Sequence, residues 1–375
     1  MKVDKRHFMD LVEKQIRSSL HWDSAATYSD RPTLVAAAEH ICLAEGAKRA
    51  RPKLVYYLSK GLGLKSNALE NTEHGELNQK LVLPKLVDVA VCVEFIHSAS
   101  LLHDDVIDNG VLRRNRATVN QKWDNLTAVL AGDLLLAESI KGLRNCPREV
   151  AQGALELVAE MTRSTMLEAH VRASTEVTPE QWLYIADGKT SSMFRWCGQA
   201  VGQIMQSEEA VERFGLFGTH FGIAFQMADD LLDLQPELSG KTPFADIRNR
   251  NPSYPMILAQ QESPAFRDAL ALAWKGNSAA KASELRSGQE FITGSGKSCS
   301  SAEASAFETI PEATVMELGK MIAHTSAKDR TRERITEEVN IAIDALGPYR
   351  DVPGCREVAM WAAAMCQRFQ IKVPA

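Results

Sequence analysis

Two clusters of aspartates share one spacing, and each lies within an apolar stretch. Both follow the pattern Asp-Asp-x-x-Asp; they are Asp104, Asp105 and Asp108 in SLLHDDVIDNG, and Asp229, Asp230 and Asp233 in FQMADDLLDL. Residues four apart on a helix share a face. Carboxylates held this close repel one another, and a divalent cation relieves that repulsion. Hard oxygen ligands suit Mg²⁺, which keeps several waters and shares its coordination with phosphate. The pattern therefore predicts two acidic helical faces that clamp magnesium and a diphosphate.

A solvated acidic helix end is the ordinary explanation for one such cluster. Two copies are harder to explain in this way, because a row of carboxylates in an apolar helix is costly unless something compensates it. The repeated pattern favours a functional site over a surface feature.

Basic segments lie beside the acidic clusters in the sequence. They are Lys48, Arg49 and Arg51 in GAKRARPKL; Arg113, Arg114 and Arg116 in VLRRNRAT; Lys189 and Thr190 in DGKTSSMF; and Lys241, with Asp246, in SGKTPFAD. Arginine offers phosphate a planar fork of donors, and lysine offers a compact charge. Each segment alone is typical of a solvated surface, but together with the aspartates they favour a metal–diphosphate site. Neither GKT is a nucleotide-binding P-loop, because Leu183 and Gln235 occupy the position of its earlier glycine.

The elements that carry these residues are predicted to be helical. Apolar residues recur three and four apart, and alternating strand patterns are scarce. The clearest predicted helices cover residues 86–103, 127–143, 150–173, 214–234 and 355–369, and Pro84, Pro147, Pro179 and Pro252 are expected at breaks. Thr178-Pro179 predicts a helix cap followed by a first-turn proline. The polar stretches 65–80 and 287–305 are predicted to be inserted loops. The expected fold is all-α, with residues 1–375 as a single domain.

The composition narrows the class of protein. The formal net charge of −5 does not indicate a nucleic-acid binder. Hydrophobic residues make up 45% of the chain, enough for a large core. The seven cysteines form no Cys-x-x-Cys pair, which favours reduced thiols and a cytoplasmic location. No apolar run is long enough for a signal peptide or a transmembrane segment.

The motifs resemble those of the trans-isoprenyl diphosphate synthases, also called polyprenyl synthetases. GxKxxRP, HxxxLxHDDxxDxxxxRR, GKT and FQxxDDxxD occur in the family's order, over nearly the whole chain. The resemblance implies a large helical bundle around a central cavity, the isoprenoid synthase-like fold. It also implies a Mg²⁺-dependent prenyltransferase that condenses isopentenyl diphosphate with an allylic diphosphate and releases diphosphate. A homodimer is expected on the same ground.

The resemblance also assigns roles to individual positions. Asp104 and Asp108, with Asp229 and Asp233, are expected to bind the metal, supported by Asp105 and Asp230. The expected contacts to isopentenyl diphosphate are Lys48, Arg51, His97 and Arg114. The expected contacts to the allylic diphosphate are Arg113, Lys189, Thr190, Gln226 and Lys241.

The sequence departs from the family pattern at several positions. Ala47 replaces a glycine, and Asn251 stands where the family has a lysine. The stretch MTRSTMLEAHVRAS lacks the usual glutamine, and 287–305 resembles an insertion. These departures keep open the alternative that the chain is a non-catalytic subunit of a heteromeric prenyl synthase. A class I terpene cyclase is a second alternative, in which the set of Lys48, Arg51 and His97 would be idle. A metal phosphohydrolase built around His103 and Asp104 is remote, because its further ligands cannot be assigned.

Product length depends in the family on the residues four and five before the first aspartate. Here these are Ser100 and Ala99, and both are small. The first acidic motif also has only two residues, Val106 and Ile107, between its aspartates. Both features favour a geranylgeranyl or longer product.

Overall fold

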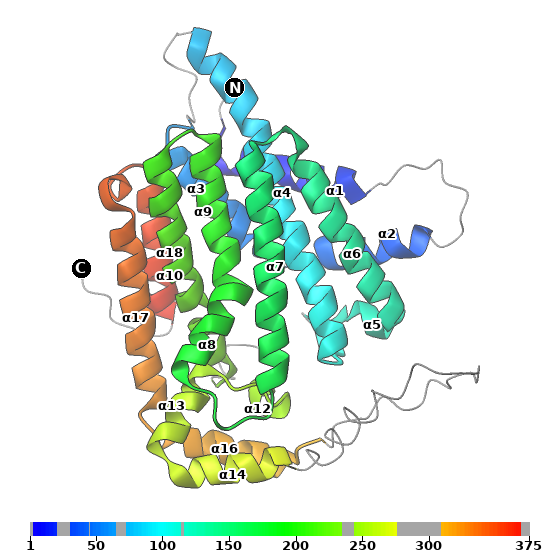
Figure 1. Ribbon diagram of the computed structural model, residues 1–375, viewed down its shortest axis with the longest axis vertical. Helices are drawn as coiled ribbons and strands as arrows, with labels where there is room; N and C mark the ends of the chain where they lie inside the picture. The colour runs from blue at the N-terminus through cyan, green and yellow to red at the C-terminus, as the bar shows by residue number, and fades with distance from the viewer. Residues whose placement is uncertain are drawn as a thin grey trace. The chain divides into compact units, whose positions relative to one another are not determined.

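The computed structural model describes residues 3–20, 31–44, 46–64, 73–113, 116–234, 244–275 and 309–368. Its regular structure is almost entirely helical (Figure 1), as the sequence predicts. Three predicted features lie outside the described residues: Arg114, Lys241 and the 287–305 segment. None of the described helices combines the length and apolar character needed to span a bilayer.

The elements follow one another along the chain. They are α1 (Lys5–Leu20), α2 (Arg31–Cys42), α3 (Ala50–Gly61), α4 (Glu73–Ile107), β1 (Leu112–Arg113), β2 (Arg116–Ala117), α5 (Val119–Lys122), α6 (Asn125–Gly142), η1 (Leu143–Asn145), α7 (Arg148–Val171), α8 (Pro179–Ala186), η2 (Asp187–Ser191), α9 (Ser192–Ile204), α10 (Glu208–Asp233), α12 (Ala245–Arg248), α13 (Tyr254–Glu262), α14 (Pro264–Trp274), α16 (Glu312–Ala323), α17 (Ala327–Ala345), η5 (Gly347–Tyr349) and α18 (Cys355–Arg368).

The chain divides into two compact units. One comprises residues 1–164, 186–225 and 335–375, and the other comprises 165–185 and 226–334. The first acidic motif belongs to the first unit and the second motif to the second. The single domain expected over 1–375 stays a prediction.

The five clearest predicted helices correspond to α4, α6, α7, α10 and α18. The prediction was wrong at one end of α4, because residues 73–80 are helical and Pro84 lies inside the helix rather than at a break. Proline removes one helical hydrogen bond. Pro84 is exposed, so water can satisfy the carbonyl group that loses its partner. The tightly packed turns that follow then hold the rest of α4 in place.

The first unit is built around α4, which packs along α6. Gly132 of α6 makes this close approach possible, since a Cβ there would lie 2.3 Å from Nε2 of His103. Aromatic rings fill the core beside it: Phe194 meets Phe221 edge-on at 5.2 Å between ring centroids, and Trp361 packs on Phe221 at 4.9 Å. Fully burying one such ring contributes roughly 2–3 kcal/mol.

In the second unit, α13, α14 and α16 pack on one another. The indole Nε1 of Trp274 donates to the carbonyl of Ile247 at 3.1 Å, which ties α14 to α12. The predicted cap of α8 is present: Gln181 N donates to Thr178 Oγ1 at 3.3 Å, and Thr178 N donates to Gln181 Oε1 at 3.0 Å. This reciprocal pair satisfies two backbone donors that the start of a helix otherwise leaves open.

Candidate active site

The C-terminal end of α4 brings an acid and a base together. Lys189 Nζ lies 3.5 Å from Asp104 Oδ2, and their side chains are only 25% and 15% exposed. The two residues are 85 positions apart in the sequence, so the fold creates this ion pair. A carboxylate can bind a divalent cation and an ammonium group can bind phosphate, so the pair offers both kinds of group at one place.

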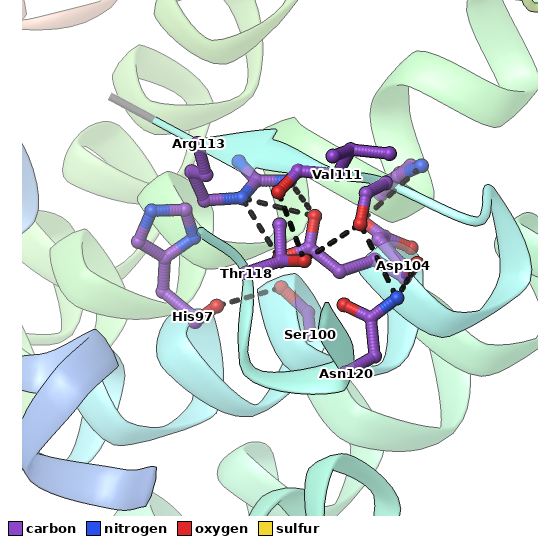
Figure 2. A network of polar contacts seen from close by, with 10 residues as sticks. His97, Ser100, Asp104, Val111, Arg113, Thr118 and Asn120 are labelled. Carbon is purple, nitrogen blue, oxygen red and sulfur yellow. Dashed lines mark hydrogen bonds and ion pairs between the residues drawn. The ribbon is translucent and has the colours of Figure 1, made fainter. Parts of the chain in front are cut away.

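The end of α4 is closed by backbone and side-chain hydrogen bonds. Asn109 adopts a left-handed conformation (φ 51°), and Gly110 N then donates to Asp105 O at 2.8 Å, as in a Schellman-type helix end. Thr118 Oγ1 donates to Gly110 O at 2.6 Å, and Asn120 Nδ2 donates to the carbonyls of Asp105 and Gly110. Figure 2 shows Thr118 and Asn120 beside the turn of α4 that carries Asp104. The turn at this end of α4 is therefore fixed.

Asp105 has a different environment from Asp104. It is 5% exposed, and it accepts from Arg113 Nε at 3.1 and 3.2 Å and from Arg113 Nη2 at 2.8 Å. Arg113 lies on β1, which pairs with β2 in a short hairpin that the sequence did not predict. Among the described residues, Nη1 of Arg113 donates to no group. The Asp105–Arg113 contact therefore anchors the hairpin and leaves one guanidinium nitrogen for a ligand.

Lys189 and Thr190 lie in η2, a π-helical turn between α8 and α9. Gly188 allows this turn to lie against α7, since a Cβ there would be 1.9 Å from Ser164 Oγ. Arg195 then fixes it, donating from Nη1 to Asp187 at 2.7 Å and from Nη2 to Glu160 at 2.6 Å. Such π-turns are frequent at functional sites.

The basic segment before α3 separates into distinct environments. Lys48 is exposed, whereas Arg49 is buried and pairs with Glu13 and Glu94, each at 2.7 Å. Arg51 is 7% exposed and lies 5.0 Å from the ring centroid of Phe194, a cation–π contact. Burial lowers the pKa of Arg51. Within the described part of the chain, its Nε has no hydrogen-bond partner, which is the state expected of a cation that awaits an anion.

His97 lies on α4, two turns before Asp104. It is half-buried, and its carbonyl accepts from Ser100 Oγ at 2.9 Å (Figure 2). Ala99, beside Ser100, is fully buried. The two small side chains identified in the sequence therefore belong to the turns of α4 that lead to the acidic motif.

The three aspartates of the second motif also differ. Asp229 is exposed. Asp230 is buried and accepts from Tyr254 N and Gln226 Nε2, both at 2.9 Å. Burial, assisted by the charges of Asp229 and Asp233, raises the pKa of Asp230 to about 7. The two functional candidates of this segment, Gln226 and Asp229, therefore both precede a buried carboxyl group that is held by protein donors.

Asp233 caps the short helix α12. Its Oδ1 accepts from Ala245 N at 2.8 Å and its Oδ2 from Asp246 N at 3.1 Å. Asp246, which follows the second GKT, was noted in the sequence only beside Lys241 and was given no role in the site. Burial and the charges of Asp233, Asp230 and Asp229 raise its pKa well above the ordinary value. Only the fold could show that Asp246 joins this acidic group, because its neighbours lie more than ten residues away in the sequence.

A family model for polyprenyl synthetases matches residues 31–290, more than half of the chain. The chain belongs to the polyprenyl synthetase family.

Individual relatives agree with this assignment. A prenyl transferase of Synechocystis is 35% identical over 237 residues, covering 62% of this chain and 69% of the relative. Solanesyl-diphosphate synthase 2 of rice is 31% identical, over 64% of this polyprenyl synthetase but only 58% of the rice protein. The crystal structure of a decaprenyl diphosphate synthase from Rhodobacter capsulatus superposes with a TM-score of 0.76 at 24% identity, covering 98% and 97% of the two chains.

In this polyprenyl synthetase Asn251 stands where the family has a lysine, so one positive charge is missing there. The arginines nearest in the sequence that could replace that charge are Arg248 and Arg250. Arg248 donates to both oxygens of Glu312, at 2.7 and 2.8 Å, so its charge is already matched. Arg250 is buried in a left-handed conformation (φ 58°), and its carbonyl accepts from Ala173 N. Oδ1 of Asn251 is buried and accepts no hydrogen bond from the described residues.

The described residues suit magnesium in one specific way. No three acidic, histidine or cysteine side chains among them converge into a ready-made metal cage. Magnesium is commonly held by one or two carboxylates and completes its octahedron with water and phosphate oxygens. Asp104 in the first unit is partly buried and Asp229 in the second unit is exposed, and each offers a hard oxygen donor of the kind that magnesium takes.

Proposed function

We propose that this polyprenyl synthetase is a prenyltransferase that joins isopentenyl diphosphate to an allylic diphosphate. The observation that carries the proposal is the pairing of Asp104 with Lys189, because a metal–diphosphate complex needs an oxygen ligand and a phosphate-binding cation at one place. Family membership and the names of its relatives support the same reaction.

Two groups of residues divide the work of binding. Isopentenyl diphosphate is held by Lys48, Arg51 and His97, with Arg114. The allylic diphosphate is held by Arg113, Lys189, Thr190 and Gln226, with Lys241. The partnerless Nε of Arg51 supports the first assignment and Nη1 of Arg113 the second. A terpene cyclase takes a single diphosphate, so it would have no use for Arg51 in this state.

The reaction follows from these assignments. The C–O bond of the allylic diphosphate breaks, and Lys189 and Arg113 stabilise the charge that develops on the departing diphosphate. The double bond of isopentenyl diphosphate attacks the allylic carbon, and one proton leaves to the released diphosphate. Apolar walls exclude water, which would otherwise quench the cation.

Magnesium is the proposed cofactor. Asp104 and Asp108 would hold it from the first motif, and Asp229 and Asp233 from the second, with Asp105 and Asp230 supporting them. When bound, it would neutralise the diphosphate and favour departure of the leaving group. In the second motif Asp229 is the better candidate for a metal ligand, because both oxygens of Asp233 accept hydrogen bonds from backbone N–H groups.

A product of geranylgeranyl length or longer is proposed from Ala99 and Ser100, whose small side chains leave room for a growing tail. The rice relative carries the name of a long-chain synthase, which supports this length.

A homodimer in the cytoplasm is also proposed. The outward face of α6 exposes Leu126 (67%), Val129 (37%) and Leu130 (44%) at helical spacing. Apolar stripes of this kind mark protein interfaces. Sedimentation velocity should give a dimer for the wild type. The double variant Leu126→Glu, Leu130→Glu should dissociate this dimer, whereas the control Leu216→Glu on α10 should leave it intact. Fractionation of cells tests the location.

An assay with Mg²⁺, isopentenyl diphosphate and a series of allylic primers tests the reaction itself. We expect diphosphate release and a longer prenyl product, both abolished by EDTA and restored by Mg²⁺. If no primer gives product while the protein is folded, the non-catalytic subunit becomes the better explanation, and Asn251 is the first residue to examine.

A further inference from the structure

The hairpin of β1 and β2 is held from two sides. On one side Arg113 forms an ion pair with Asp105 of α4. On the other, His40 of α2 contacts β2: its Nε2 lies 2.7 Å from Ala117 O, and its Nδ1 lies 2.9 Å from Arg116 Nη2. His40 is 76 residues from Arg116 in the sequence, and no recognised motif includes it.

These two contacts define one state of the imidazole. Arginine can only donate, so Nδ1 must be the acceptor from Arg116. The proton then lies on Nε2, which donates to the Ala117 carbonyl. The ring of Trp123 meets His40 nearly edge-on at 5.6 Å between centroids. Burial lowers the pKa of His40; the hydrogen bond to the Ala117 carbonyl opposes this shift, and the charges of Arg116 and Lys122 add to it, so the balance favours the neutral ring that the two contacts require.

The strand register connects His40 to the proposed site. Arg116 lies opposite Arg113 in the two-stranded ladder. A ladder of two residue pairs is not stable by itself and depends on contacts with the rest of the protein. His40 fixes β2, β2 fixes β1, and β1 aims Arg113 at the end of α4.

We propose that His40 is a positioning residue, which holds the hairpin so that Arg113 keeps its free guanidinium nitrogen directed at a substrate diphosphate. The proposal rests on the proposed function and adds to it a residue that touches neither substrate nor metal.

Two substitutions at position 40 separate hydrogen bonding from packing. His40→Phe keeps an aromatic ring beside Trp123 but loses both hydrogen bonds. His40→Gln keeps one donor and one acceptor. We expect His40→Phe to raise the KM of the allylic diphosphate about tenfold with kcat changed less than threefold, and His40→Gln to stay within about threefold of wild type in both. Arg116→Leu, which removes the contact from the other side, should resemble His40→Phe, and His324→Phe, at the residue that follows α16, is the matched control.

Hydrogen–deuterium exchange of residues 111–118 gives a readout that needs no catalysis. Exchange should rise in His40→Phe and Arg116→Leu but not in His40→Gln. An unchanged KM together with unchanged exchange in His40→Phe would overturn the proposal, and so would a His40→Gln variant as impaired as His40→Phe. If the wild type makes no product, the exchange experiment still tests the role of His40 in the hairpin, so failure of the proposed function is distinguishable.

Discussion

The ammonium group of Lys189 lies 3.5 Å from Oδ2 of Asp104, across η2 and the last turn of α4. Both groups are proposed to serve the same diphosphate, one by direct contact and the other through a cation. The ion pair therefore holds the two side chains at one place in the free protein, which reduces the reorganisation needed when substrate arrives.

Lys189→Gln should reduce kcat about 100-fold, because one charged donor to the leaving group is lost. Its effect on the free energy of unfolding should stay below about 1 kcal/mol, since the pair is partly solvated. Steady-state kinetics and urea unfolding measure the two effects. Lys141→Gln, which removes an exposed pair with Glu138 on α6, is the control. A wild-type kcat for Lys189→Gln would contradict the proposed role.

Neighbouring aspartates of the second motif should respond differently to neutralisation. Asp229→Asn should lower kcat at least 100-fold and increase the Mg²⁺ concentration needed for half-maximal rate, because Asp229 is the exposed oxygen donor. Asp230→Asn should keep much more activity, since Asp230 is buried among protein donors, and should change unfolding by about 1 kcal/mol. Magnesium titrations of both variants make the comparison. Equal losses, or the reverse order, would show that burial does not separate their roles.

Arg113→Met should destabilise the protein by about 2 kcal/mol, because it leaves the buried carboxylate of Asp105 without its partner. Asp105→Asn in the same chain should recover part of that loss, since the neutral amide has less need of a cation. Urea unfolding of the two single variants and the double variant completes a double-mutant cycle. Strictly additive losses would mean that the contact does not anchor the hairpin.

Arg51→Met should separate stability from function. Removing a buried charge whose Nε lacks a partner should stabilise the free protein by about 1 kcal/mol, while the KM of isopentenyl diphosphate rises about 100-fold. Thermal unfolding tests the expected gain in stability, and steady-state kinetics tests the expected rise in the KM of isopentenyl diphosphate. Arg49→Met is the contrasting variant: it should be strongly destabilising, because it leaves Glu94 buried and unpaired. Unchanged substrate affinity in Arg51→Met would remove Arg51 from the site.

Ser100→Phe should shorten the product. A phenyl ring one turn before Asp104 would fill the space proposed for the growing tail, and the rate with a short primer should fall much less than the chain length. Mass spectrometry of the products from several primers measures the effect. Ser18→Phe on the exposed face of α1 is the control, and an unchanged product distribution for Ser100→Phe would place the tail elsewhere.

The sequence alone determined the all-α class, the family motifs and the main helices, because these depend on local spacing. Period-3.6 patterns identify helices, and the repeated Asp-Asp-x-x-Asp with adjacent basic segments indicates the chemistry. Local spacing failed at Pro84, where a helix continues through a residue that ordinarily breaks one. It also missed β1 and β2, which are too short to show alternation.

Tertiary structure decided how residues of one type divide their roles. Asp104 and Asp105 are adjacent and chemically identical, yet one meets Lys189 and the other is held by Arg113. Arg49 and Arg51 differ in the same way, as do Asp229 and Asp230. His40 acquires a role only because the fold places it against β2. Burial and charge pairing depend on residues distant in the sequence, so a motif specifies which groups are present and only the folded chain determines what each of them touches.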